Sequence, residues 1–180
     1  MRKLMHILTV AFVLLTVVFY AVYFFTESVA AYSVFVTFLT FSYHFLMRLT
    51  VGFFTGFIPD KLLNPENKWF SPKKSEKKIY KILKVKKWKG SVPAYYHDAF
   101  NVEKHSLKEI SVSMCVAELT HEIIVVFSFV PILFSLKFGE PAVFIITSFV
   151  AAGVDMIFVV VQRYNRPRIL RLIELKRNKI

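Results

Sequence analysis

Four long hydrophobic segments limit what this chain can fold into. They cover residues 4–25, 29–58, 110–136 and 141–161, with boundaries good to a few positions. A helix needs roughly 20 apolar residues to cross the hydrocarbon core of a bilayer, and each segment reaches about that length. The sequence therefore predicts an all-α integral membrane protein with four transmembrane helices in a single membrane domain, residues 1–180.

The composition agrees with this prediction. Hydrophobic residues make up 56% of the chain, whereas a soluble domain is less than half apolar on average. The single cysteine, Cys115, excludes an intrachain disulfide, so nothing points to an oxidising extracellular domain. The first apolar run is also too long for the hydrophobic region of a signal peptide, which favours a retained first span over cleavage after "SVA" at 28–30.

The distribution of positive charge predicts the topology. The polar stretch 59–108 carries 13 lysines against five acidic residues, and the tail 163–180 carries seven Lys or Arg against one acid. The short connections near Glu27 and Gly139 are almost without positive charge. By the positive-inside rule, both termini and the middle stretch are cytoplasmic. Because the lysines flank membrane spans, anionic lipid accounts for them and nucleic acid is not an expected partner.

The middle stretch contains a lysine-rich segment that we expect to lie in the membrane interface. Ser71 and Pro72 stand in the order typical of a helix N-cap and first helical position. The apolar stripe of the predicted helix consists of Ile79, Ile82 and Leu83, and its aromatic anchors are Trp69 and Trp88. A basic amphipathic helix with such anchors is typical of an interfacial segment between the second and third spans.

Polar residues inside the spans are the candidates for a site, because charges at bilayer depth are costly and are usually functional. They are His44 and Arg48 in the second span, Glu118, His121 and Glu122 in the third, and Asp155 in the fourth. With the topology above, all of them fall at the depth of the cytoplasmic leaflet. Two interpretations remain open: a site built from three helices, or ion pairs with Arg48 and the tail arginines that only hold the bundle together.

A metal site is an alternative but is not the prediction. Glu118 and His121 form one Glu-x-x-His motif, whereas a di-iron centre needs two such motifs and two further glutamates. A mononuclear site that adds His44 and Asp155 is conceivable, yet no H-E-x-x-H motif or cysteine pair supports it. We therefore predict no metal and no cofactor, and keep a metal-dependent intramembrane enzyme using Glu118 and His121 as an alternative.

Four strings together resemble a known family. They are "NPENKWF" at 64–70, "KILKVKKWKGSVP" at 81–93, "AELTHE" at 117–122 and "QRYNRPR" at 162–168. In this order and spacing they resemble the bacterial glycosyl-4,4'-diaponeurosporenoate acyltransferases, which complete staphyloxanthin-type carotenoids. The resemblance implies a multi-pass protein of the bacterial cell membrane that transfers a fatty acyl group from a donor to a hydroxyl of a lipid-linked sugar. The implied partners are the lipid bilayer, this acceptor and an acyl donor such as acyl-CoA.

The chain lacks a G-x-S-x-G elbow, so direct attack of the hydroxyl on the thioester is the simpler mechanism. His121 is the candidate general base, Glu118 or Glu122 its partner, and His44 the reserve base. Arg163 and Asn165 are candidates to stabilise the oxyanion, and Arg48 with the lysines of 81–89 to hold donor phosphate. The full set of candidate substrate-binding residues is Arg48, Asp155, Gln162, Arg163, Asn165, Arg166, Trp88 and Lys89. A non-enzymatic lipid-binding or partner-supporting bundle remains the other alternative.

Overall fold

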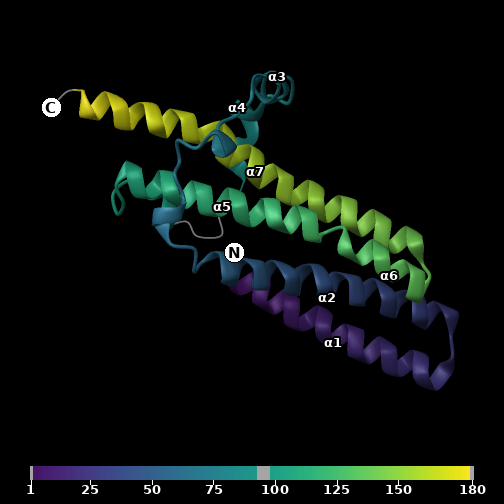
Figure 1. Cartoon of the computed structure of the whole chain (residues 1–180). Helices are drawn as coiled ribbons and strands as arrows, with labels where there is room; N and C mark the ends of the chain where they lie inside the picture. The colour runs from purple at the N-terminus through teal and green to yellow at the C-terminus, as the bar shows by residue number, and fades with distance from the viewer. Residues whose placement is uncertain (1, 93–97, 179–180) are drawn as a thin grey trace. The chain divides into compact units, whose positions relative to one another are not determined.

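The computed structural model describes residues 2–92 and 98–178, and within these residues the fold consists of helices and connecting loops (Figure 1). The long helices are α1 (Arg2–Thr26), α2 (Val29–Thr55), α5 (Leu107–Phe127) and α7 (Pro141–Arg177), and the nine-residue α6 (Val130–Phe138) lies between α5 and α7 in the chain. The polar stretch between α2 and α5 contains the short helices α3 (Lys74–Ile82) and α4 (Val85–Trp88). It also contains the 3₁₀ turns η1 (Asp60–Leu62), η2 (Lys68–Phe70), η3 (Lys89–Ser91) and η4 (Asp98–Phe100). Pro93 and the last two residues of the basic tail lie outside the described residues.

The all-helical prediction is confirmed, as is the number of helices long and apolar enough to cross a membrane. The four candidate spans are Lys3–Thr26, Val29–Thr55, Leu107–Phe138 and Pro141–Arg177. Their outward faces are apolar: on α1, for example, Ile7, Leu14 and Val17 are each more than half exposed. Such a surface is stable in lipid and not in water. The orientation of the termini and the interfacial position of the middle stretch stay predictions.

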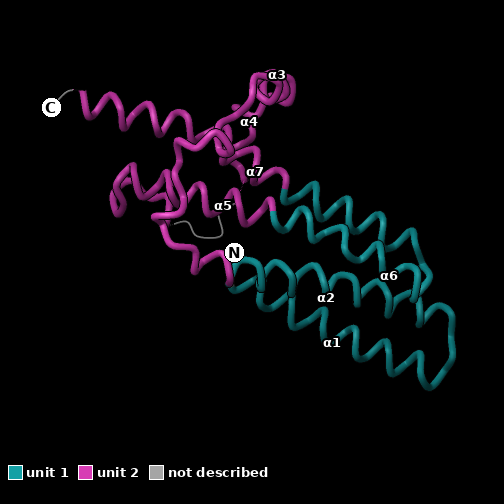
Figure 2. Tube along the Cα trace, viewed as in Figure 1, with its two compact units in different colours: residues 1–53, 123–155 teal, residues 54–122, 156–180 magenta. Residues whose placement is uncertain are grey.

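The chain forms two compact units, shown in different colours in Figure 2. Unit 1 consists of residues 1–53 and 123–155, and unit 2 consists of residues 54–122 and 156–180. The boundary cuts across α5 and α7, so each of these helices contributes one segment to each unit. The single membrane domain expected from the sequence stays a prediction, and the two units are described separately.

Aromatic packing holds unit 1 together. Its buried core contains Phe35, Val36 and Phe144, which brings together α2 and α7. Rings of α1 and α2 interlock, and the Phe12 ring lies 5.0 Å from that of Phe45. A hydrogen bond joins α2 to α6: the Tyr32 hydroxyl donates to the carbonyl oxygen of Phe138 at 2.7 Å. Large rings supply this contact area with few rotatable bonds, and so at low cost in conformational entropy.

The third span is two helices, not the single helix over 110–136 that the sequence predicted. α5 ends at Phe127, and α6 begins at Val130 with Pro131 in its first turn. Proline has no N–H to donate to the carbonyl four residues earlier, so the ladder of hydrogen bonds is interrupted here. The carbonyl oxygen left over, on Phe127, accepts a bond from the Tyr43 hydroxyl at 3.0 Å. A side chain of α2 thus satisfies the backbone group that the proline releases.

The fourth helix also differs from its predicted bounds. It continues from Pro141 to Arg177 and includes Pro167, whereas the hydrophobic segment ends near position 161. The change from apolar to basic residues near position 161 marks the expected membrane–water interface, and α7 continues past it. The second span ends at Thr55, three residues before the predicted boundary.

The lysine-rich segment forms a helix, but this begins later than the sequence indicated. The N-cap of α3 is Lys73, not Ser71, and no side chain caps the N-terminus. Ile79, Ile82 and Leu83 are each about half exposed or more, as expected for an apolar stripe without a protein partner. Lys84, in the left-handed conformation with φ 51°, separates α3 from α4.

Candidate functional site

A fully buried carboxylate on α5 forms the centre of the candidate site in unit 2. Glu118 is 0% exposed. Its Oε1 accepts a hydrogen bond from Arg163 Nε at 2.7 Å, and its Oε2 accepts one from Arg166 Nη2. Both arginines belong to α7 and lie three positions apart. They therefore share a helix face, so that both can reach the same carboxylate. A buried charge needs such partners, since leaving it unpaired costs several kcal/mol.

Arg166 is as deeply buried as its partner, with 1% of its surface exposed. Its Nη1 donates to the Phe70 carbonyl at 2.7 Å and its Nη2 also donates to the Met114 carbonyl at 3.1 Å. The guanidinium lies over the Phe70 ring, 4.8 Å from its centre. Its Nε is buried without a hydrogen-bond partner among the described residues.

Arg163 connects the same carboxylate to the polar stretch. Its Nη1 donates to Glu76 on α3 at 2.9 Å. Its Nη2 donates to the Trp69 carbonyl at 2.9 Å and to Glu122 at 3.1 Å. Glu122 in turn accepts a bond from the Trp69 indole N–H at 3.0 Å. We call Glu76, Glu118, Glu122, Arg163 and Arg166 the glutamate–arginine network. It ties α5, α7 and the segment around α3 together with charge-assisted bonds.

Tyr80 extends this network on the α3 side. Its buried hydroxyl donates to Glu76 at 2.9 Å. Burial, followed by the hydrogen bond to Glu76, raises the pKa of Tyr80 well above its ordinary value. The phenol therefore remains protonated and acts as a donor at physiological pH.

His121 occupies the same region of α5, one turn after Glu118. It is partly buried, and its imidazole stacks on the Phe158 ring with 4.5 Å between centroids and 9° between planes. Imidazole nitrogens accept and donate in the plane of the ring, and parallel stacking on Phe158 fixes that plane.

A second polar group of unit 2 gathers around α7. Lys89 donates to the Oδ1 of Asn165, and its Nζ lies 5.3 Å from the centre of the Tyr164 ring. Burial, and then the nearby Arg168, lowers the pKa of Lys89. The Trp88 indole donates to the Leu83 carbonyl at 2.9 Å. Gln162, the remaining residue of this predicted set, is partly buried on α7.

The other three predicted residues lie together in unit 1. Arg48 on α2 forms an ion pair with Asp155 on α7 and also donates to the Ala151 carbonyl at 3.3 Å. His44 is 3% exposed, one turn before Arg48, and neither of its ring nitrogens has a hydrogen-bond partner among the described residues. The structure therefore groups His44, Arg48 and Asp155 in one unit and the other predicted residues in the second unit. The convergence of all these residues on one site stays a prediction.

The residues that the structure describes contain no group of three or more His, Cys, Asp or Glu side chains that could hold a metal ion. Glu118, the main ligand of the metal alternative, has both oxygens on arginines.

The model of one protein family, glycosyl-4,4'-diaponeurosporenoate acyltransferase, matches residues 66–175. The match covers well over half of the chain. This chain belongs to the glycosyl-4,4'-diaponeurosporenoate acyltransferase family. The family resemblance stated from the sequence is thereby confirmed, and membership indicates an acyltransferase of carotenoid biosynthesis with membrane-spanning helices. No curated protein and no solved structure matches the chain.

The family match contains every residue of the glutamate–arginine network, together with His121, Lys89 and Asn165. His44 and Arg48 lie before the matched range. The part of the chain that matches the family model therefore contains the unit 2 site.

Sequence reasoning missed two members of this site. Glu76 contacts Arg163, and Trp69 contacts both Arg163 and Glu122. Glu76 is the only acid in the lysine-rich run from 68 to 89. A single acid among so many lysines could have been recognised in the sequence as a candidate ion-pair partner. The Trp69 carbonyl gives no signal in a sequence, because any residue type has one.

Proposed function

We propose that this protein transfers a fatty acyl group from an acyl thioester to a hydroxyl of a membrane glycolipid at the cytoplasmic leaflet. The observation that carries the proposal is the family match across the whole unit 2 site. The clustering of lysines between α2 and α5, where an anionic donor would approach from the cytoplasm, supports it.

The proposed reaction is direct transfer without an acyl-enzyme. His121 accepts the proton of the acceptor hydroxyl while the hydroxyl oxygen attacks the thioester carbonyl carbon. The tetrahedral intermediate then expels the thiolate as its C–S bond breaks. The thiolate takes the proton from His121, so that an ester and a free thiol leave. A general base in this position typically contributes a factor of about 10² to 10⁴ in rate.

The contacts in unit 2 change the proposed roles of the charged residues. All three nitrogens of the Arg163 guanidinium already donate within the network. We therefore give Arg163 and its carboxylate partners a positioning role: they hold α5, and with it His121, against α7. Asn165 and Lys89 are then the better candidates to stabilise negative charge on the thioester oxygen.

The experiment is thiol release from a long-chain acyl-CoA by the purified protein, with and without a bacterial glycolipid extract. Release that depends on the acceptor, and that falls by about 10² to 10⁴ in His121→Ala, is the expected result. His105→Ala is the matched control, because His105 pairs with Glu109 outside the network and is expected to keep full activity.

Three outcomes of the thiol-release experiment would contradict parts of this proposal. If folded, metal-free protein releases no thiol with any acyl-CoA, the transfer proposal with this donor is wrong. If His121→Ala instead loses folded protein and activity together, the structural alternative for α5 gains support. A loss of release in His44→Ala alone would move the base to unit 1.

A further inference from the structure

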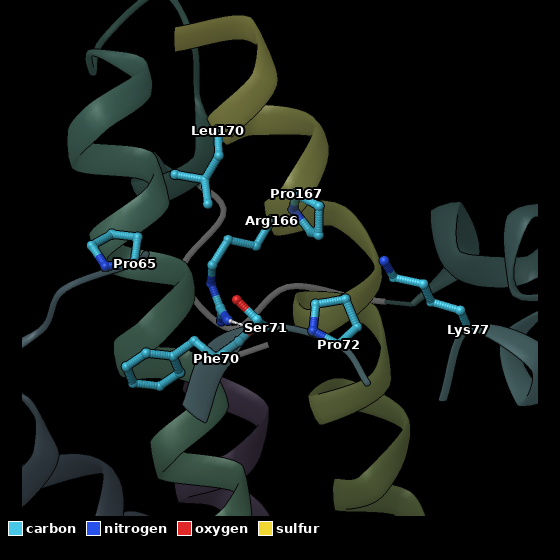
Figure 3. Close-up of a pocket in the computed structure, with 8 residues that line it drawn as sticks. All are labelled: Pro65, Phe70, Ser71, Pro72, Lys77, Arg166, Pro167 and Leu170. Atoms are coloured by element: carbon cyan, nitrogen blue, oxygen red, sulfur yellow. Dashed lines mark hydrogen bonds between the residues drawn. The ribbon is translucent and has the colours of Figure 1, made fainter. Parts of the chain in front are cut away.

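A small pocket lies beside Arg166 in unit 2 (Figure 3). Its volume is about 170 Å³. Its apolar walls include Phe70, Pro167 and Leu170, and its polar groups belong to Ser71, Lys77 and Arg166. A cavity of about 150 Å³ holds a benzene molecule, so this pocket has room for a group of the size of a phosphate.

The inner wall of the pocket contains an unused hydrogen-bond donor. The two terminal nitrogens of Arg166, Nη1 and Nη2, donate to Phe70, Met114 and Glu118. The N–H on Nε is buried without a partner in the part of the chain that the structure describes. A buried donor left unpaired costs about 1–3 kcal/mol. This residue is 1% exposed and lines the pocket, so its spare donor indicates a bound acceptor.

The N-terminus of α3 adjoins the same pocket. Ser71 and Pro72 line it and directly precede the N-cap residue Lys73, at which no side chain caps the helix. The backbone N–H groups of a first turn have no partner within the helix, and the helix dipole makes them attractive to anions. Glu76, the acid of this first turn, is engaged by Arg163 and Tyr80.

Lys77 adds a positive charge at the opening. It lines the pocket, and Figure 3 shows its side chain extending from α3 toward Pro72 and Pro167. The charge of Arg166 is largely offset by Glu118, so Lys77 is the main uncompensated charge here. A lysine ammonium beside a helix N-terminus is a common arrangement for phosphate.

We propose that this pocket binds the phosphate group of a phosphate ester through Lys77, the N-terminus of α3 and Arg166. Two sources carry that group near a membrane surface: a coenzyme A thioester and the headgroup of an anionic phospholipid. The assignment of the pocket to the acyl donor rests on the proposed function, whereas phosphate binding by itself does not. Neither Lys77 nor Ser71 is among the residues that the sequence suggested for substrate.

The test is the affinity of the full-length protein for coenzyme A, measured by calorimetry in nanodiscs of phosphatidylcholine. Coenzyme A is expected to bind, inorganic phosphate to compete with it, and pantetheine, which has no phosphate, to bind at least tenfold more weakly. Lys77→Gln is expected to weaken binding about tenfold, the usual effect of losing one charged hydrogen bond. Leu170→Trp, which fills the pocket without changing charge, is expected to weaken binding by a similar factor.

Lys78→Gln is the matched control, because it removes the same charge from the next residue of α3, which is not part of the pocket lining. Affinity unchanged in Lys78→Gln supports the pocket. Equal weakening in both lysine variants would overturn the proposal in favour of a diffuse basic surface. No binding of coenzyme A to the wild type would overturn it as well.

Nanodiscs that contain phosphatidylglycerol distinguish the two sources. If the headgroup occupies the pocket, phosphatidylglycerol lowers the affinity for coenzyme A in the wild type but not in Lys77→Gln. If the donor occupies it, affinity is the same in both lipids. If the wild type transfers acyl groups but binds no coenzyme A, the pocket proposal is refuted and the proposed function is intact. If the wild type binds coenzyme A through Lys77 but releases no thiol, only the proposed function is refuted.

Discussion

Glu118 is a fully buried charge with two charged partners. Its carboxylate, 0% exposed, forms ion pairs with two arginines of α7. Replacing it with glutamine keeps the shape but leaves two guanidinium charges with one partner fewer. Breaking a buried ion pair from one side costs about 3–5 kcal/mol. We therefore expect Glu118→Gln to lower the free energy of unfolding by about that amount, measured by denaturant titration in detergent micelles.

Glu122→Gln is the comparison for this prediction. The Glu122 side chain is 22% exposed, and water screens its bond to Arg163. The expected loss is about 1 kcal/mol or less. Equal losses in the two variants would show that burial does not set the strength of the network.

Replacing His44 is expected to raise the free energy of unfolding, unlike the two glutamate substitutions. Its imidazole is 3% exposed, and neither ring nitrogen has a hydrogen-bond partner among the described residues. A buried polar group in this state is destabilising by about 1–3 kcal/mol. His44→Leu, which removes the polar atoms and keeps most of the volume, is therefore expected to raise the free energy of unfolding by about 1 kcal/mol. The Arg48 bond to the backbone carbonyl of residue 44 is retained. A loss of stability in the same micelle titration would contradict this account.

At the scale of elements, the break between α5 and α6 depends on one tyrosine and one proline. The Tyr43 hydroxyl bonds to the Phe127 carbonyl, for which Pro131 has no N–H to offer. Tyr43→Phe is expected to cost about 0.6–1.7 kcal/mol, the range for side-chain hydrogen bonds between membrane helices. In a Pro131→Ala background the backbone N–H of residue 131 is available, so the same change is expected to cost less.

A double-mutant cycle with unfolding as the readout measures that coupling. Thr37→Val serves as a control, because the Thr37 hydroxyl donates to the carbonyl of Ser33 in its own helix. Its cost is expected to be the same in both backgrounds. Additive effects of Tyr43→Phe and Pro131→Ala would mean that the tyrosine does not compensate for the proline.

For the whole molecule, the charge distribution predicts that both termini and residues 59–108 are cytoplasmic. Cys115 is the only cysteine and is buried, so Cys115→Ala gives a background for single-cysteine labelling. In intact cells, a membrane-impermeant maleimide is expected to label Ser28→Cys, in the α1–α2 connection. It is expected to label Ser75→Cys and Lys176→Cys only after permeabilisation. Labelling of Ser75→Cys in intact cells would reverse the topology.

The sequence by itself determined the helical fold, the four spans and the family. These properties are local or compositional: the length of an apolar run, the asymmetry of lysines and the spacing of short strings such as "QRYNRPR" are visible without tertiary structure. Helix ends were less predictable, because Pro131 interrupts the third span while Pro167 lies inside α7. The outcome at each proline depends on what other elements offer to the released backbone groups.

Tertiary structure alone decided which charges meet. Depth in the membrane suggested that His44, Arg48, Glu118 and Asp155 share one site, which stays a prediction, but depth fixes only one coordinate and does not identify the ion-pair partner of each charge. In the fold, Arg48 pairs with Asp155 in unit 1, and Glu118 pairs with Arg163 and Arg166 in unit 2. The same holds for Glu76 and the Trp69 carbonyl, which contact Arg163 from a segment about 30 to 40 residues before α5. Ion pairs over such separations form only when folding brings their helices together, so no periodicity along the chain encodes them.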